Sequence, residues 1–158
     1  MHNASSQINH VLVRLFNDIL DIEERALAVG DFFDASVREM HVLEAVGATG
    51  GENSMSAVAA RLGITVGSLT VAVTTLERKG YLIRERATDD KRVVRVSLTQ
   101  RGVSANAHHA RFHKEMVASI QDQLNEEQLT VLTVALEHMT HFFEGYLERA
   151  QLSGASVD

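Results

Sequence analysis

The chain has eight histidines and no cysteine, so imidazole rather than thiolate is its candidate metal-binding group. His109 and His113 are four residues apart and His138 and His141 are three apart, spacings at which two side chains on one helix can chelate an ion. Neither pair comes with an obvious carboxylate to complete a ligand set, and His113 falls on an apolar stripe, where a hydrogen-bonded core histidine is commoner. We therefore expect no metal ion or other cofactor, and we keep zinc sensing by these two pairs as an alternative.

The same histidines could serve a metal-dependent enzyme, with Glu115 or Glu137 as the general base. The sequence contains no metalloprotease helix motif, no nucleophile elbow and no phosphate-binding loop. An enzyme is thus the least favoured class of protein, and we expect no catalytic residues.

A second group of side chains lies on a helix expected over residues 66–79. One face carries Val66, Leu69, Val73 and Leu76 and should pack into the core. The other face is poor in charge, unlike an ordinary solvated face. Its hydroxyl groups can bond base edges or phosphates, and its methyl groups can contact the methyl of thymine. With the residue before the helix, the candidate DNA-reading set is Thr65, Gly67, Ser68, Thr70, Val71, Thr74 and Arg78.

The segment that follows this helix carries the basic side chains that the helix lacks. They are Arg84, Arg86, Lys91 and Arg92, together with Arg95. Charge is segregated along the whole chain: residues 1–53 carry a net −6, residues 54–114 carry +7 and residues 115–158 carry −7. A basic middle between acidic ends is typical of a nucleic-acid-binding segment with a scaffold on either side.

The surrounding pattern predicts the elements that hold these residues. Apolar steps of three and four indicate helices over about 6–29 and 35–47, and Ser54 and Gly63 bound a short helix before the one at 66–79. Two β-type runs, 81–87 and 93–98, flank a polar turn. Two more helices follow, one opened by Thr99 and Gly102 and one capped by Asn125. The expected fold is mainly α: a winged helix-turn-helix whose wing is a small β-hairpin.

The terminal helices carry more apolar surface than one chain of this size can bury. A double stripe runs along residues 8–27, and the last helix has a coiled-coil-like seam of Leu129, Leu132, Leu136, Met139, Phe143 and Tyr146. We expect a homodimer. The expected division is a dimerisation helix at 1–30, the DNA-binding domain at 31–99, dimerisation helices at 100–150 and a flexible tail at 151–158.

The N-terminus lacks the pattern of a signal peptide, and no stretch approaches the roughly 20 apolar residues of a membrane span. We expect a cytoplasmic protein with no membrane partner.

Three segments in the middle of the chain resemble the MarR family of bacterial regulators. They are residues 58–65 (VAARLGIT), 76–82 (LERKGYL) and 90–99 (DKRVVRVSLT), the last of which fits that family's Asp-x-Arg-x-x-x-Val-x-Leu-Thr wing pattern. The resemblance implies a homodimeric repressor that binds a pseudo-palindromic operator in double-stranded DNA. It also implies that Arg92 enters the minor groove and that Asp90 holds it in place.

Further segments resemble the MarR-type repressors of fatty-acid synthesis: 22–24 (IEE), 38–41 (REMH), 92–94 (RVV) and 111–117 (RFHKEMV). This resemblance implies control of fatty-acid biosynthesis genes, with long-chain acyl-acyl carrier protein as co-repressor. A zinc-responsive MarR-type repressor remains the alternative. The residues expected to line an acyl pocket are Phe16, Leu20, Phe33, Met40, His41, His109, Phe112, His113 and Met116.

Overall fold

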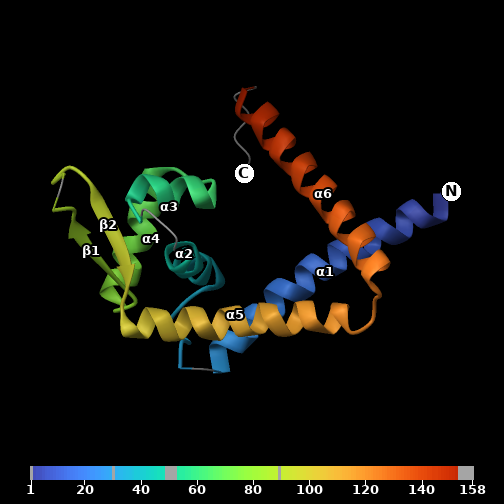
Figure 1. Cartoon of the computed structure of the whole chain (residues 1–158), viewed down its shortest axis with the longest axis horizontal. Helices are drawn as coiled ribbons and strands as arrows, with labels where there is room; N and C mark the ends of the chain where they lie inside the picture. Colours follow the sequence, from blue (N-terminus) through green and yellow to red (C-terminus); the bar gives the residue numbers. More distant parts are fainter. Residues whose placement is uncertain (1, 30, 49–52, 89, 153–158) are drawn as a thin grey trace. The chain divides into compact units, whose positions relative to one another are not determined.

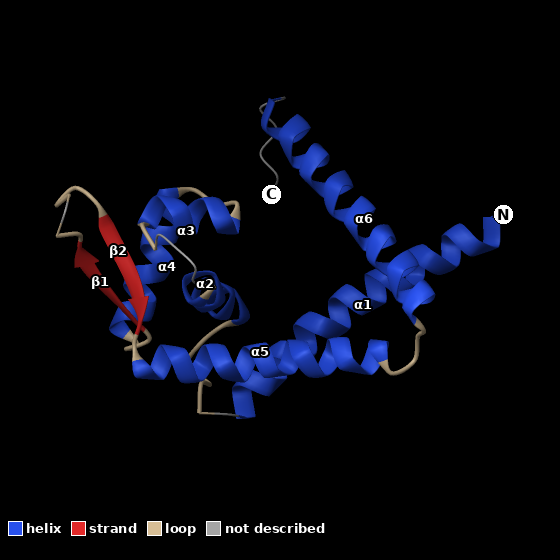
Figure 2. Cartoon of the chain, in the orientation of Figure 1, coloured by secondary structure: helices blue, strands red, loops and turns tan. Residues whose placement is uncertain are grey.

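A computed structural model of the 158-residue chain describes residues 2–29, 31–48, 53–88 and 90–152. Within these ranges lie six helices and one two-stranded hairpin (Figure 1 and Figure 2). Their order is α1 (His2–Val29), α2 (Val37–Gly47), α3 (Met55–Leu62), α4 (Val66–Arg78), β1 (Leu82–Arg86), β2 (Val94–Leu98), α5 (Gln100–Gln121) and α6 (Glu126–Leu152). Residues up to Arg111 form one compact unit and those from Phe112 a second.

Short polar side chains begin the helices of the first unit. Ser36 and Glu39 form a reciprocal capping box at the start of α2. Ser54 caps α3 and Thr65 caps α4, each through a hydrogen bond from a backbone N–H of the first turn. Between α3 and α4 the chain turns at Gly63, whose φ of 65° is left-handed backbone that glycine adopts without strain. The predicted helix-turn-helix is therefore confirmed at its caps and its turn.

The core of the first unit forms where α2, α3, α4 and the hairpin meet. Met40, Leu43, Leu69 and Leu76 are fully buried there. Residue Gly102 lets α5 approach this core, because a Cβ at that position would collide with the carbonyl oxygen of Tyr81. Helix α4 packs on the same core through its buried residues.

The hairpin pairs β1 with β2 in antiparallel register, from Leu82 opposite Leu98 to Arg86 opposite Val94. The segment before α3 adds a further rung: Ser54 bridges Arg95, and the Val96 backbone N–H donates to the carbonyl oxygen of Asn53 at 2.8 Å. This rung joins the root of the wing to the helix-turn-helix.

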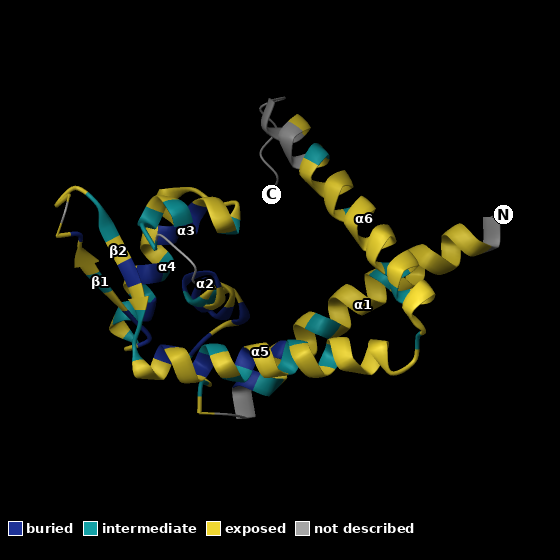
Figure 3. Ribbon diagram, in the orientation of Figure 1, coloured by how far each residue is buried: buried dark blue, intermediate teal, exposed yellow. Residues whose placement is uncertain are grey.

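The long helices α1 and α6 are largely exposed along their length (Figure 3). Seven large apolar residues of α1, from Ile8 to Ile22, are 46% to 61% exposed, and only Leu12 and Ile19 of this stretch are partly buried. On α6, Leu136, Phe143 and Tyr146 are 49%, 48% and 56% exposed. A single chain leaves both of these apolar faces open to solvent.

The predicted elements agree with the structure except at their edges. Helix α1 begins at His2 rather than near residue 6. The expectation for Val66 was wrong: it is 45% exposed and faces the wing, because the first turn of α4 projects beyond the core. The predicted loop at 48–53 and tail at 151–158 lie mostly outside the described residues.

Across the described chain, no single helix has the length and apolar character to cross a membrane. Helices α3 and α4 meet that test only together, as a pair bent by 105°.

Candidate nucleic-acid interface

The first turn of α4 is held in a defined geometry by its own cap. The Thr65 hydroxyl accepts the Ser68 backbone N–H at 3.1 Å, and the two side-chain oxygens lie 2.9 Å apart. Both residues are exposed. At Gly67, an added Cβ would meet only Thr65 Oγ1, at an ordinary 3.7 Å. The turn therefore offers hydroxyl groups and an open backbone to a partner.

Further along the same face, the threonines have fixed hydroxyl orientations. Thr70 Oγ1 donates to the Val66 carbonyl and Thr74 Oγ1 to the Thr70 carbonyl, each at 2.7 Å. Since their protons point into the helix, the outward lone pairs are left as acceptors. Such acceptors match the exocyclic amino groups of adenine and cytosine in the major groove. Val71, 69% exposed, adds an apolar surface for a thymine methyl group.

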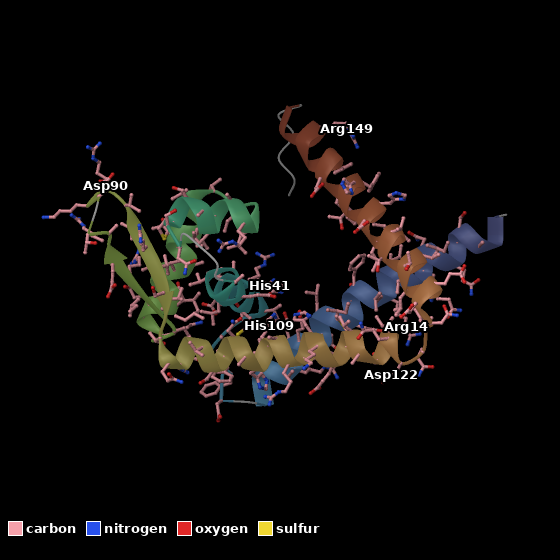
Figure 4. The ribbon with its side chains drawn as sticks, in the orientation of Figure 1. Arg14, His41, Asp90, His109, Asp122 and Arg149 are labelled. Carbon is pink, nitrogen blue, oxygen red and sulfur yellow. The ribbon has the colours of Figure 1, made fainter. Side chains whose placement is uncertain are left out.

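The wing presents its basic groups to solvent at the tip. The Arg92 side chain is 95% exposed, and its backbone N–H donates to Asp90 Oδ1 at 2.9 Å. The Arg92 Nε lies 3.8 Å from the same oxygen, a distance that leaves the guanidinium open to solvent. Figure 4 shows Asp90 at the outer end of the hairpin. Lys91 and Arg86 are also exposed.

Arg84 plays a different part from the other cations of the wing. Its Nε and Nη2 donate to Glu77 Oε2 at 2.9 and 2.6 Å, which ties β1 to α4. The hydrogen bond from Arg84 lowers the pKa of the Glu77 carboxyl below its usual value, by more than partial burial raises it. Arg84 thus pairs its charge within the protein and links the wing to α4.

Helix α4 and the wing enclose an open hollow of about 510 Å³, lined in part by Val66, Thr70, Arg84 and Arg92. Six residues that line the hollow were not site candidates in the sequence: Ser54, Met55, Ser56, Val66, Val93 and Val94. Val66 belongs to the apolar repeat of α4 and so was assigned to the core. Ser56 carries no signal beyond its place in the first turn of α3.

The residues proposed for an acyl pocket lie in different surroundings. Met40 is fully buried in the core, whereas Phe33 is 73% exposed and Phe16 and Leu20 are 49% and 51% exposed. His41 and His109 are brought together, with ring centroids 5.4 Å apart. In the second unit Phe112, His113 and Met116 are half-buried.

The second histidine pair of the sequence, on α6, is exposed. The His141 Nδ1 lies 2.7 Å from the carbonyl oxygen of Glu137 in its own helix. In the described part of the chain, this pair is not part of a group of three metal-ligating residues.

The caps, the reading face and the exposed wing arginine define a winged helix-turn-helix protein of the DNA-binding class. A model of the MarR family matches residues 33–93. The crystal structure of Streptococcus pneumoniae FabT in complex with DNA has a TM-score of 0.82 and 37% identity, covering 90% of this chain and 99% of that one. The chain therefore belongs to the MarR family, and it is a DNA-binding transcription regulator rather than an enzyme.

Two other relatives share the fold at lower identity. The Staphylococcus aureus MepR–DNA complex has a TM-score of 0.69 and 20% identity, covering 86% of this chain and 97% of that one. ZitR of Lactococcus lactis is 28% identical over 106 residues, which are 65% of this chain and 72% of ZitR. The structure of ZitR, described as a zinc-responsive family member, has a TM-score of 0.60 and 21% identity, covering 86% of this chain and 99% of that one.

Proposed function

We propose that this protein is a homodimeric repressor of fatty-acid biosynthesis genes, with long-chain acyl-acyl carrier protein as its co-repressor. The observation that carries the DNA-binding part is the wing tip, where the Arg92 side chain is 95% exposed beside Asp90. The fatty-acid part rests on the match to FabT across 90% of the chain.

In this proposal α4 is the recognition helix and reads the major groove, and the wing contacts the adjacent minor groove. Ser68, Thr70 and Val71 present acceptors and methyl groups to base edges. Arg92 enters the minor groove, where an A·T-rich sequence narrows the groove and strengthens its negative potential. Two copies of this unit in a symmetric dimer fit a pseudo-palindrome whose half-sites lie about 10 bp apart.

The dimer is supported by the apolar faces of α1 and α6. Leucine and phenylalanine side chains there are about half exposed, a state that a soluble chain avoids over so long a surface. A second copy of the chain supplies a matching face under two-fold symmetry. Val117 and Ile120 of α5, 47% and 41% exposed, extend the same type of surface.

For the effector, an acyl chain needs apolar lining and an acidic carrier protein needs cations. Phe16 and Leu20 offer the first on α1. Arg14 and Arg111 are candidate cations on the first unit, and each already contacts another side chain. Arg14 Nε lies 3.2 Å from Asp18 Oδ2, and Arg111 Nη2 lies 3.1 Å from His108 Nδ1. A carrier protein that binds either arginine would have to displace these contacts.

The test is a titration of operator DNA with protein, alone and with acylated carrier protein, unacylated carrier protein or Zn²⁺. The proposal requires tighter operator binding with acylated carrier protein and no change with the unacylated form. Linkage requires DNA to tighten effector binding by the same factor. Equal affinity with both forms of carrier protein would contradict the fatty-acid signal but not DNA binding.

A zinc-responsive repressor is the second candidate function. It is favoured by the closeness of Glu23, His41 and His109, whose potential ligand atoms lie within 4.8 Å of one another. ZitR, a relative of this chain, is described as zinc-responsive. Tighter operator binding in the Zn²⁺ arm of the titration alone would favour this candidate over the first.

A further inference from the structure

Helix α4 lies between two hollows on the surface of the first unit. The first, beside the wing, is lined on α4 by Val66 and Thr70. The second, of about 490 Å³, lies between α4 and α2 and is lined on α4 by Ser68, Val71 and Ala72. The hairpin packs on one side of α4 and α2 on the other (Figure 1). The exposed face of α4 is therefore a ridge with a hollow along each flank.

The dimensions of B-DNA indicate what could occupy the two hollows. The major groove is about 12 Å wide, which is close to the diameter of an α-helix with its side chains. A helix that lies in the groove therefore has one sugar-phosphate backbone along each of its flanks. If α4 enters the groove with its exposed face, one strand follows the hollow beside the wing and the other follows the hollow beside α2.

We propose that the hollow between α4 and α2 binds the sugar-phosphate backbone on the side of α4 away from the wing, and that Arg38 of α2 holds a phosphate there. This inference rests on the proposed DNA-binding function. It adds a contact to the second strand, made by a residue that was not among the DNA-binding candidates of the sequence.

The Arg38 side chain is available for such a contact. Arg38 is exposed and lines the second hollow. In the described ranges of the chain, no group forms a hydrogen bond or an ion pair with its guanidinium. By contrast, Arg61, Arg84 and Arg101 each donate to a partner within the first unit. An unpaired guanidinium can bind phosphate oxygens through two parallel N–H donors.

The charge and the walls of the hollow favour an anion. Among the described residues that line it, Glu39 alone is acidic. Lys79 Nζ donates to both oxygens of that carboxylate, at 2.8 and 2.7 Å, and so balances its charge. Arg38 therefore leaves the hollow with a net positive charge. Val42 is buried and Leu62 is half-buried, and such apolar walls focus the field of a nearby cation.

The stability of α2 does not explain an arginine at position 38. Arg38 is the second residue of α2, and the N-terminal end of a helix carries a partial positive charge. A cation in this turn is therefore mildly unfavourable for the helix. The same partial charge attracts an anion, so a phosphate contact accounts for the position and for the type of the residue.

The test uses the full chain and an operator duplex that the wild-type protein selects from random DNA. Fluorescence anisotropy over a salt series compares wild type with Arg38→Gln, Arg38→Lys and the matched control Arg25→Gln. Arg25, on α1, has a side chain that is 77% exposed and is paired with Asp21. Arg38→Gln should weaken binding at least about fivefold and lower the slope of log affinity against log salt by about 1 for each arginine removed from the DNA. Arg38→Lys keeps the charge and should keep the slope, and Arg25→Gln should behave as wild type.

A second measurement locates the contact on the DNA. Single phosphates of the operator are replaced by uncharged methylphosphonates, and the affinity of each duplex is measured. The phosphate that contacts Arg38 should weaken wild-type binding when it is neutralised and should have no further effect in Arg38→Gln. Arg92→Ala should keep the wild-type response at that phosphate. The urea midpoint of Arg38→Gln should not fall below that of wild type, because the substitution removes an unfavourable charge from the start of α2.

Unchanged affinity and slope in Arg38→Gln, with losses in Arg92→Ala, would overturn the contact and leave the proposed DNA binding in place. Equal losses in Arg38→Gln and Arg25→Gln would also overturn it, because a general loss of positive charge would then explain the effect. So would a lower urea midpoint together with a methylphosphonate profile of unchanged shape, which would indicate a structural role in α2. A wild-type protein that selects no duplex and binds none would overturn the proposed function itself, and the contact with it.

Discussion

The Tyr81 hydroxyl donates a hydrogen bond to Asp34 Oδ1 at 2.6 Å, from the base of the wing to the segment between α1 and α2. Arg101 of α5 donates to the same oxygen at 2.9 Å and lies 4.3 Å above the Tyr81 ring. Partial burial by itself would raise the pKa of the Asp34 carboxyl. The Tyr81 hydrogen bond and the Arg101 charge have the larger combined effect, so the pKa of Asp34 lies below its usual value. Burial and the same carboxylate raise the pKa of Tyr81.

This relationship predicts a dependence of stability on pH. A carboxyl group with a lowered folded-state pKa stabilises the fold above its unfolded pKa, and that contribution is lost as the pH falls through the folded value. Asp34→Asn should therefore be less stable than wild type at neutral pH. The difference should begin to shrink below about pH 4 and should disappear only below the lowered folded-state pKa of Asp34. Urea unfolding over a pH series measures the difference.

The control for that series is Asp31→Asn, which removes an exposed carboxyl group from the same turn. It should leave the pH dependence of the wild type in place. A constant gap between Asp34→Asn and wild type at every pH would mean that lost packing, not lost charge, explains the effect.

The ion pair of Lys79 and Glu39 should contribute to stability because its side chains are only 23% and 12% exposed. Lys79→Met should lower the free energy of unfolding by about 1–2 kcal/mol. Glu39→Gln retains a side chain that can complete the capping box with Ser36, so it removes the ion pair alone. A double-mutant cycle from denaturant unfolding should give a coupling of about 1 kcal/mol. A coupling near zero would show that Lys79 does not brace α2.

The dimer depends on apolar residues of α6, and Phe143 is one of them. Phe143→Asp places a charge in the seam. The dimer should therefore dissociate, and its subunits should unfold at the same time. Sedimentation equilibrium with circular dichroism follows both. Thr130→Asp, at an exposed position of α6 outside the seam, should remain dimeric. A wild-type protein that sediments as a folded monomer at micromolar concentration would exclude the proposed dimer.

Local signals in the sequence predicted the elements well, because caps and turns are made by residues close together in the chain. Ser54 and Asn125 were predicted to begin helices, and each caps its helix through its own side chain. The wing was predicted for the same reason: its turn and its alternation lie within a short stretch of sequence.

Long-range relationships could not be predicted in this way. Glu23, His41 and His109 come from three helices, so no spacing rule connects them. The engagement of Arg84 by Glu77 likewise depends on the packing of β1 against α4. From the sequence, Arg84 was one of several equivalent cations; its different role emerges only when its partner is known.

The central claim, that recognition helix and wing together bind DNA, is tested most directly on Arg92 by fluorescence anisotropy with operator DNA over a range of salt concentrations. Arg92→Ala should weaken binding to every sequence and lower the slope of log affinity against log salt by about 1 for each arginine removed from the DNA. Thr70→Ala should instead keep the salt slope and change which operator sequence is preferred. Unchanged affinity and slope in Arg92→Ala would contradict the account.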